Sequence, residues 1–169
     1  GLTLGALTGT FDRLPGLLSI IARDTDGTPL GTLHEGAMAL VERLVPPATD
    51  ADLRRAILES QRYLHSLGIT NWQDAWVTPS EEAAYRALGD SGELTARVVG
   101  ALWWERGEGP DQIESLVERR AKASAGRFRP TSVKLMVDGI IENGTAAMLE
   151  PYLDAHGHDR PGRYGHLRP

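Results

Sequence analysis

The feature that most constrains this sequence is an alternation of short apolar runs with segments of helical periodicity. The apolar runs cover residues 69–75, 94–104 and 132–137, and each has the composition of a β-strand. Strands that alternate with amphipathic helices form parallel βαβ units with right-handed crossovers, so we predict an α/β fold. Three such units make a small α/β domain or part of a (β/α)8 TIM barrel, which typically needs about 250 residues.

Capping signals place the helices between these strands. Thr49 is the expected N-cap of a helix over 50–67. Thr78 begins a second helix, which we expect to end at Gly89. Further helices are predicted over 110–126 and, capped by Thr145, over 146–150.

The two ends of the chain carry weaker patterns. Residues 1–48 are expected to form an irregular arm or a hairpin around the turn 24–27, followed by a short helix that Pro46 ends. Residues 156–169 are rich in Gly, Pro, Arg and His, which is typical of irregular structure. We therefore predict a single domain over 1–169, with its β/α units in 49–155.

Composition excludes several classes of protein. The absence of cysteine rules out disulfides, thiolate metal ligands and cysteine nucleophiles. A net charge of −5 provides no basic field for nucleic acid. No apolar run reaches the roughly 18 residues of a membrane helix, so we expect no membrane contact and a soluble, cytoplasmic protein.

Lys134 is the most unusual residue in the sequence. Only two of the 18 basic residues are lysines, and Lys134 lies inside an apolar run. Burial disfavours the charged ammonium, and a neutral amine can form a Schiff base, act as a base, or add carbon dioxide. The resulting carbamate is an anion that can bridge two metal ions. Alternatively, Lys134 pairs with a buried acid or extends its ammonium to solvent.

Strand alternation predicts where Lys134 points. Lys134 and Met136 share one face, whereas Val133, Leu135 and Val137 share the other. The more uniformly apolar face should pack against helices, which leaves Lys134 facing the interior of a barrel.

Other candidate residues follow from the rule that function gathers at the carboxyl ends of parallel strands. Asp74 lies near the end of the first predicted strand, Trp103 lies near the end of the second, and Asp138 follows the third. We expect these three side chains to contact substrate. His156 and His158 have the spacing of metal ligands, but they lie in the irregular tail, so we interpret them as polar loop residues.

Several segments together resemble amidohydrolase family 3, a group of metal-dependent hydrolases that includes N-substituted formamide deformylases. Residues 21–35 are similar to its stretch R-D-x-x-G-x-P-x-G-x-L-x-E. Residues 68–75 resemble its strand G-I-T-x-x-x-D-A. Residues 133–139 and 145–152 resemble its paired motifs V-K-x-x-x-D-G and T-A-x-L-x-E-P-Y.

The resemblance implies a fold, a cofactor and a role for one residue. The family fold is a (β/α)8 barrel beside a small β-sandwich, and this chain resembles barrel strands two to four. Lys134 falls where many amidohydrolases carry a carboxylated, metal-bridging lysine. The implied cofactor is a divalent metal, expected to be zinc. The family's histidine and aspartate ligands from the first, fifth, sixth and eighth strands match nothing in the sequence.

The leading hypothesis is an internal fragment of a metal-dependent hydrolase. It would cleave a non-peptide, amide-type carbon–nitrogen bond of a small molecule through a metal-activated water. Because most ligands are missing, we expect no complete catalytic set in this chain. One alternative is a non-catalytic α/β module in which Lys134 is structurally paired, and another is a Schiff-base lyase built on Lys134. We also expect self-association, since part of a barrel exposes unpaired sheet edges.

Overall fold

A computed structural model describes residues 21–34, 37–142, 146–153 and 156–158 of the 169. The chain divides into two compact units. The first unit is Gly1–Pro47 with Val137–Pro169, and the second unit is Ala48–Met136. We describe each unit by itself. Within the described ranges, no helix has both the length and the apolar character needed to cross a membrane.

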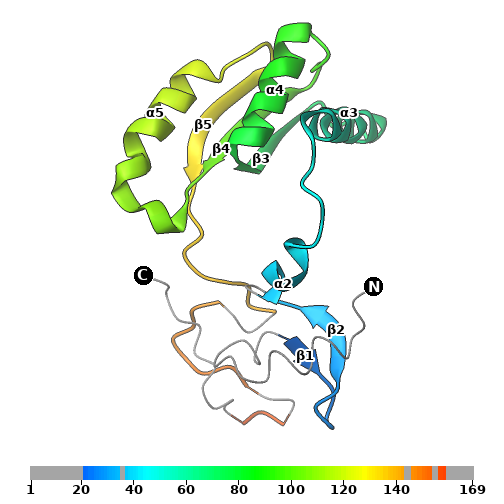
Figure 1. The fold of residues 1–169 in the computed structure, drawn as a ribbon, viewed down its shortest axis with the longest axis vertical. Helices are drawn as coiled ribbons and strands as arrows, with labels where there is room; N and C mark the ends of the chain where they lie inside the picture. Colours follow the sequence, from blue (N-terminus) through cyan, green and yellow to red (C-terminus); the bar gives the residue numbers. More distant parts are fainter. Residues whose placement is uncertain (1–20, 35–36, 143–145, 154–155, 159–169) are drawn as a thin grey trace. The chain divides into compact units, whose positions relative to one another are not determined.

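The second unit is built on a parallel three-stranded sheet (Figure 1). Its strands are β3 (Asn71–Val77), β4 (Arg97–Trp103) and β5 (Phe128–Lys134), in the order β3-β4-β5. The predicted α/β class is therefore confirmed, with parallel strands joined by helices. Membership of a closed barrel stays a prediction.

Three α-helices and one 3-10 helix accompany this sheet: α3 (Asp50–Ser66), α4 (Pro79–Ser91), η2 (Arg106–Gln112) and α5 (Ile113–Lys122). Thr49 caps α3 as predicted, because its Oγ1 accepts a 3.2 Å bond from the Asp52 backbone N–H. In return, the Thr49 N–H donates a 3.0 Å hydrogen bond to the Asp52 carboxylate, which completes a capping box. Hydrogen bonds from Thr49 lower the pKa of Asp52, so the box is strongest when this carboxyl is ionised.

The core of the second unit lies between one face of the sheet and the helices. Val98 and Leu102 of β4 and Phe128 of β5 are at most 1% exposed. The Phe128 ring stacks on Tyr85 of α4, with ring centroids 4.7 Å apart. Gly100 leaves the room for this arrangement, since a Cβ there would lie 2.9 Å from the Phe128 ring.

Strand β5 begins earlier than the sequence pattern suggested. The third predicted strand is confirmed, but its predicted bounds, 132–137, are wrong, because β5 starts at Phe128 and ends at Lys134. Pro130 lacks an N–H and cannot donate a hydrogen bond between strands, so its presence argued against a strand at this position. In the structure, Pro130 is nevertheless part of β5, and its side chain is buried. Lys134 is the register partner of Trp103, the last residue of β4, so the residues after it have no β4 neighbour.

Helix α4 continues past Gly89, contrary to the prediction. It ends at Ser91, and Gly92 adopts the left-handed conformation at φ 77°. Gly89 is required for a different reason, which is contact with the turn before β5. A Cβ on Gly89 would lie 2.4 Å from the Ala125 carbonyl oxygen, and one on Gly126 would lie 2.4 Å from the Gly89 oxygen. These two backbones therefore touch directly.

The first unit contains an antiparallel hairpin and a short helix. Strands β1 (Ile21–Arg23) and β2 (Pro29–Leu33) pair across the predicted Asp-Gly turn, and α2 spans Ala39–Glu42. Hairpin and helix are thus confirmed, whereas residues 1–20 lie outside the described ranges.

The helix predicted over 146–150 is wrong. No residue of 146–150 is helical, and Thr145 lies outside the described ranges. The local polar groups bond elsewhere, because the Ala147 N–H donates to Asp138 Oδ2 at 2.9 Å and the Tyr152 hydroxyl donates to the Ala146 carbonyl at 2.9 Å. These bonds compete with a helical turn.

A buried ion pair joins α4 to α5. Arg119 Nε lies 2.7 Å from Glu82 Oε2, and the two side chains are only 20% and 11% exposed. The Arg119 guanidinium also donates to the Val77 carbonyl at 3.5 Å. The pair therefore links two helices to the end of β3.

We expect Arg119→Met to lower the free energy of unfolding of the intact protein by about 3 kcal/mol, because it leaves Glu82 buried without a cation. Arg86→Met, at an exposed arginine of α4, is the matched control and should change it by less than about 0.5 kcal/mol. The double variant Glu82→Met/Arg119→Met should recover part of the loss, because no charge is then stranded. Urea denaturation measures all three; equal losses in the two arginine variants would contradict the assignment.

Candidate functional site

The candidate site lies at the carboxyl ends of β4 and β5, on the sheet face opposite the core. Val98 and Leu102 point into the core, so Val99, Ala101 and Trp103 alternate onto the other face. The register pairs Ala101 with Ser132 and Trp103 with Lys134. We call this set of side chains, namely Val99, Ala101, Trp103, Ser132 and Lys134, the open-face row.

Lys134 occupies the last position of this row. It is half-buried and is the final residue of β5. Among the residues that the structure describes, none forms a hydrogen bond or ion pair with its ammonium. Its neighbours Val133 and Leu135 line a groove beside α5, so Lys134 alternates to the face away from that helix. That this face is the interior of a barrel stays a prediction.

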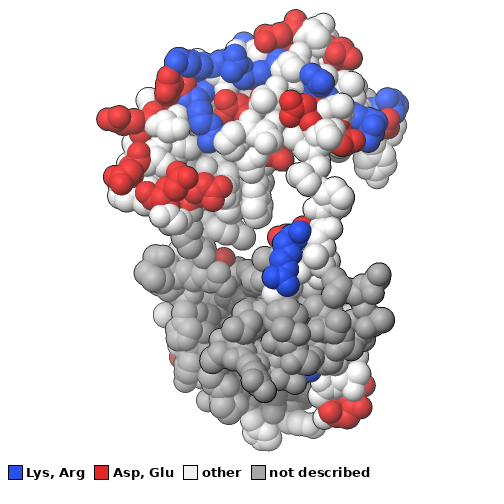
Figure 2. All heavy atoms as spheres, viewed as in Figure 1, with Lys and Arg blue, Asp and Glu red and all other residues white. Residues whose placement is uncertain are grey.

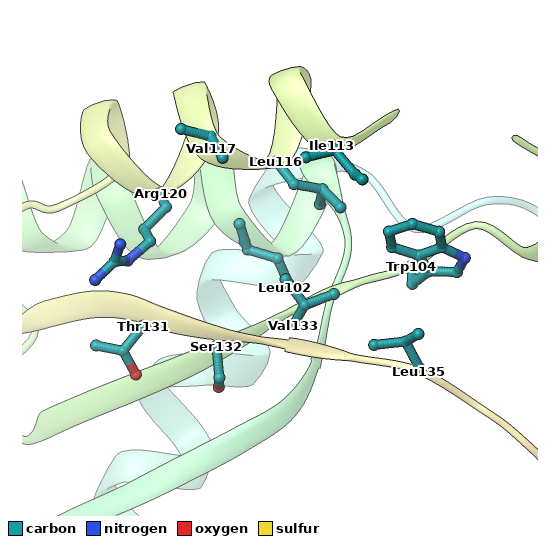
Figure 3. Close-up of a pocket in the computed structure, with 10 residues that line it drawn as sticks. All are labelled: Leu102, Trp104, Ile113, Leu116, Val117, Arg120, Thr131, Ser132, Val133 and Leu135. Carbon is teal, nitrogen blue, oxygen red and sulfur yellow. The ribbon is translucent and has the colours of Figure 1, made fainter. Parts of the chain in front are cut away.

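The groove beside α5 is apolar and lies on the core side of the sheet edge. Figure 3 shows Ile113, Leu116 and Val117 of α5 above β5, with Thr131 and Ser132 pointing away from the helix. Its volume is about 360 Å³. The complete lining is Leu102, Trp104, Ile113, Leu116, Val117, Arg120, Thr131, Ser132, Val133 and Leu135.

Two tryptophans stack at the carboxyl ends of β3 and β4. The rings of Trp76 and Trp103 are parallel within 1°, with centroids 4.0 Å apart. Trp76 is 53% exposed, so the pair presents an aromatic surface. Since Trp103 is the register partner of Lys134, this surface adjoins the lysine.

Asp74 acts on this pair from the core side of the sheet. Its Oδ2 accepts a 2.9 Å bond from the Tyr85 hydroxyl, and its Oδ1 accepts a 3.0 Å bond from the Trp76 N–H. Burial, and then the charge of Asp74, raise the pKa of Tyr85, so the hydroxyl stays a donor. The register shifts between Asp74 and Val77, and this irregularity lets Trp76 stack with Trp103 on the face that Asp74 does not occupy.

A buried glutamine fixes the loop that follows β4. Gln112 is 7% exposed and its Oε1 accepts a 2.9 Å bond from the Glu105 N–H. Its Nε2 donates to the carbonyls of Glu105 at 2.7 Å and Gly109 at 2.9 Å. Sequence reasoning missed this residue, because nothing in the pattern distinguishes it from a surface glutamine.

Asp138 belongs to the first unit, in which its carboxylate accepts the bond from Ala147 already described. The structure brings Trp103 and Lys134 together and directs the Asp74 carboxylate to Tyr85. Asp138 organises the chain after β5.

The described residues do not make a complete metal site. They contain no group of three or more His, Cys, Asp or Glu side chains able to hold an ion. His156 and His158 lie with ring centroids 6.4 Å apart and are not joined by a third ligand within that part of the chain.

Comparison with known proteins settles the family. A model described as the amidohydrolase family matches residues 5–166. The chain belongs to this family. The resemblance found in the sequence is therefore confirmed, while the likeness to formamide deformylases stays a prediction.

Individual relatives of this amidohydrolase chain are much longer than it is. The exoenzymes regulatory protein AepA of Pectobacterium carotovorum subsp. carotovorum is 32% identical over 148 residues, which is 85% of this chain and 31% of that protein. An uncharacterized metal-dependent hydrolase from Pyrococcus horikoshii OT3 has a TM-score of 0.61 at 22% identity, over 88% of this chain and 29% of that one. Another from Pyrococcus furiosus has a TM-score of 0.58 at 27% identity, over 80% and 28%. The likeness to the Pyrococcus horikoshii structure shows a shared fold.

The stacked indoles give a measurable signal. We expect exciton coupling between Trp76 and Trp103 in the far-ultraviolet circular dichroism of the intact protein, and Trp103→Phe should abolish it. Tyr85→Phe should weaken it and lower stability by about 1 kcal/mol, because Asp74 loses a hydrogen bond. Trp104→Phe is the matched control next to Trp103 and should preserve the signal; its loss in that variant would contradict the assignment.

Proposed function

We propose that this chain is part of a metal-dependent hydrolase that cleaves a non-peptide, amide-type carbon–nitrogen bond of a small molecule. Family membership supports hydrolysis in general. The observation that carries the specific proposal is the position of Lys134 at the carboxyl end of β5, on the open face of the sheet, where no described residue forms an ion pair with its amine. This is the end of a parallel sheet at which reactive groups gather.

Lys134 would serve as a metal ligand after carboxylation. Its neutral amine attacks the carbon of carbon dioxide, a nitrogen–carbon bond forms, and one π pair of a C=O bond moves onto oxygen. One proton leaves the nitrogen for water. The product is a carbamate whose oxygens can ligate a divalent metal, which we expect to be zinc. Such a metal, when bound, supplies an activated water and polarises the scissile carbonyl.

The other candidate residues would shape the substrate site. Trp103, backed by Trp76, forms an aromatic wall beside Lys134 that can exclude water from one side. Asp74 would act through the Trp76 backbone and is a positioning residue in this scheme. Asp138 would hold the chain that follows β5.

Two alternatives to the hydrolase are a purely structural role for Lys134 and a Schiff-base lyase. A structural role for Lys134 requires an acidic partner, and the described ranges contain no ion pair to it. A Schiff-base lyase remains chemically distinct, because borohydride would trap its substrate adduct on Lys134. Metal content separates that mechanism from the hydrolase.

In the intact protein, Lys134→Ala should lose bound metal and at least about 100-fold in amide hydrolysis, since a direct ligand matters no less than its supporting shell. Acetate or propionate should partly restore both, because a carboxylate can replace the carbamate. Lys122→Ala is the matched control, since the other lysine only pairs with Glu118 on the surface of α5. Elemental analysis and turnover are the readouts; full metal content and activity in Lys134→Ala would remove this residue from the site.

We also propose that the isolated chain self-associates through the groove beside α5. Ile113 and Val117 are 50% and 62% exposed there, and β5 has one strand neighbour in the described sheet. Light scattering should show a mass that rises with concentration. Val117→Lys should reduce it, whereas Glu114→Lys, a control on the same helix outside the groove lining, should not. A concentration-independent monomer would contradict this expectation.

A further inference from the structure

A second pocket lies at the amino ends of the same three strands, at the opposite end of the sheet from Lys134. Its volume is about 300 Å³. At about 30 Å³ per water in the liquid, this space could hold roughly ten waters. We call it the amino-end pocket, and its lining is His65, Thr70, Asn71, Thr95, Arg97 and Arg127.

Backbone pairing at the beginnings of the strands brings these residues together. Asn71, the first residue of β3, is the register partner of Arg97, the first residue of β4. The Arg97 N–H donates to the Thr70 carbonyl at 3.0 Å, and the Val98 N–H donates to the Arg127 carbonyl at 3.0 Å. Arg97 and Arg127 are thus held side by side by the sheet itself.

A buried hydrogen-bond network fixes one wall of the pocket. Gln61 of α3 is 8% exposed, and its Oε1 accepts bonds from the N–H groups of Thr95 at 2.9 Å and Ala96 at 3.0 Å. Its Nε2 donates to the Glu93 carbonyl at 3.1 Å. His65 follows Gln61 by one helical turn and so shares its face of α3. The network therefore fixes the backbone that leads into β4 and carries Thr95 of the pocket lining.

The pocket carries positive charge that the described part of the chain does not neutralise. No acidic side chain lines it. Neither Arg97 nor Arg127 forms an ion pair within the described ranges, whereas Arg55, Arg62 and Arg119 all do. In the view of Figure 2, acidic and basic side chains are mixed over most of the second unit, with a group of acidic ones at its lower left. What sets Arg97 and Arg127 apart is that both line one pocket that no acidic side chain lines.

We propose that the amino-end pocket binds a small tetrahedral oxyanion, either inorganic phosphate or the phosphate group of a phosphomonoester. A guanidinium presents parallel N–H donors that match two oxygens of a phosphate. The Thr70 and Thr95 hydroxyls, the Asn71 amide and the His65 ring add further hydrogen-bond donors. This binding site is separate from the proposed hydrolytic centre and does not depend on it.

Titration calorimetry of the intact protein would test the proposal. Inorganic phosphate, sulfate and glycerol 3-phosphate are added separately at constant ionic strength, with chloride as the reference, because salt screens exposed charges. We expect saturable binding of phosphate. Arg97→Gln and Arg127→Gln should each weaken it at least about tenfold, because each removes charge-assisted hydrogen bonds. Arg54→Gln, an exposed arginine of α3 outside the pocket, is the matched control and should change it less than about twofold.

Two further results decide the outcome without relying on a variant. Phosphate should slow hydrogen exchange of wild-type peptides covering 94–98 and 126–129 more than elsewhere. Tighter binding of glycerol 3-phosphate than of phosphate would identify a phosphomonoester as the ligand, and equal binding would identify the free ion. Absence of saturable binding, or equal weakening by all three arginine variants, would overturn the proposal.

Discussion

The contact on which most of the second unit depends is that between Phe128 and Gly100. The aromatic ring occupies the space that a side chain on β4 would fill, and it stacks on Tyr85 of α4. One side chain thus packs α4 against the two strands, β4 and β5. The register that begins at Val98 and Phe128 then continues, through one irregularity, to Trp103 and Lys134. The candidate site lies at the carboxyl end of this strand pair. The relative position of Trp103 and Lys134 therefore depends on how the core aligns β4 with β5.

Local sequence rules predicted which helices and strands form more accurately than the residues at which they begin and end. Thr49 and Thr78 marked helix starts because capping is a short-range interaction between neighbours in sequence. The start of β5 was missed because Phe128 and Pro130 gain their strand positions from β4 and α4, which are distant in sequence. Gly89 was mistaken for a helix end because its role is contact with Ala125, and a sequence does not display such contacts.

In the candidate site, single residues could be predicted from nearby sequence, whereas the contacts between them could not. Lys134 and Trp103 could be selected from strand alternation and the carboxyl-end rule alone. Their pairing depends on strand register, and the stack of Trp76 on Trp103 depends on a shift in register after Asp74. The role of Asp74 was expected at the substrate and lies, in the structure, in hydrogen bonds to Tyr85 and Trp76. Partners so distant in sequence are fixed only when the sheet forms.

The meeting of Gly89 and Gly126 has a consequence for substitution at both positions. Each position is closed to a side chain by the backbone of the other segment, and Gly126 is also held at φ 51°. A larger residue at one position cannot be offset by a smaller one at its neighbour, because both are already the smallest. A side chain at either position alone therefore requires α4 to lie farther from the turn before β5.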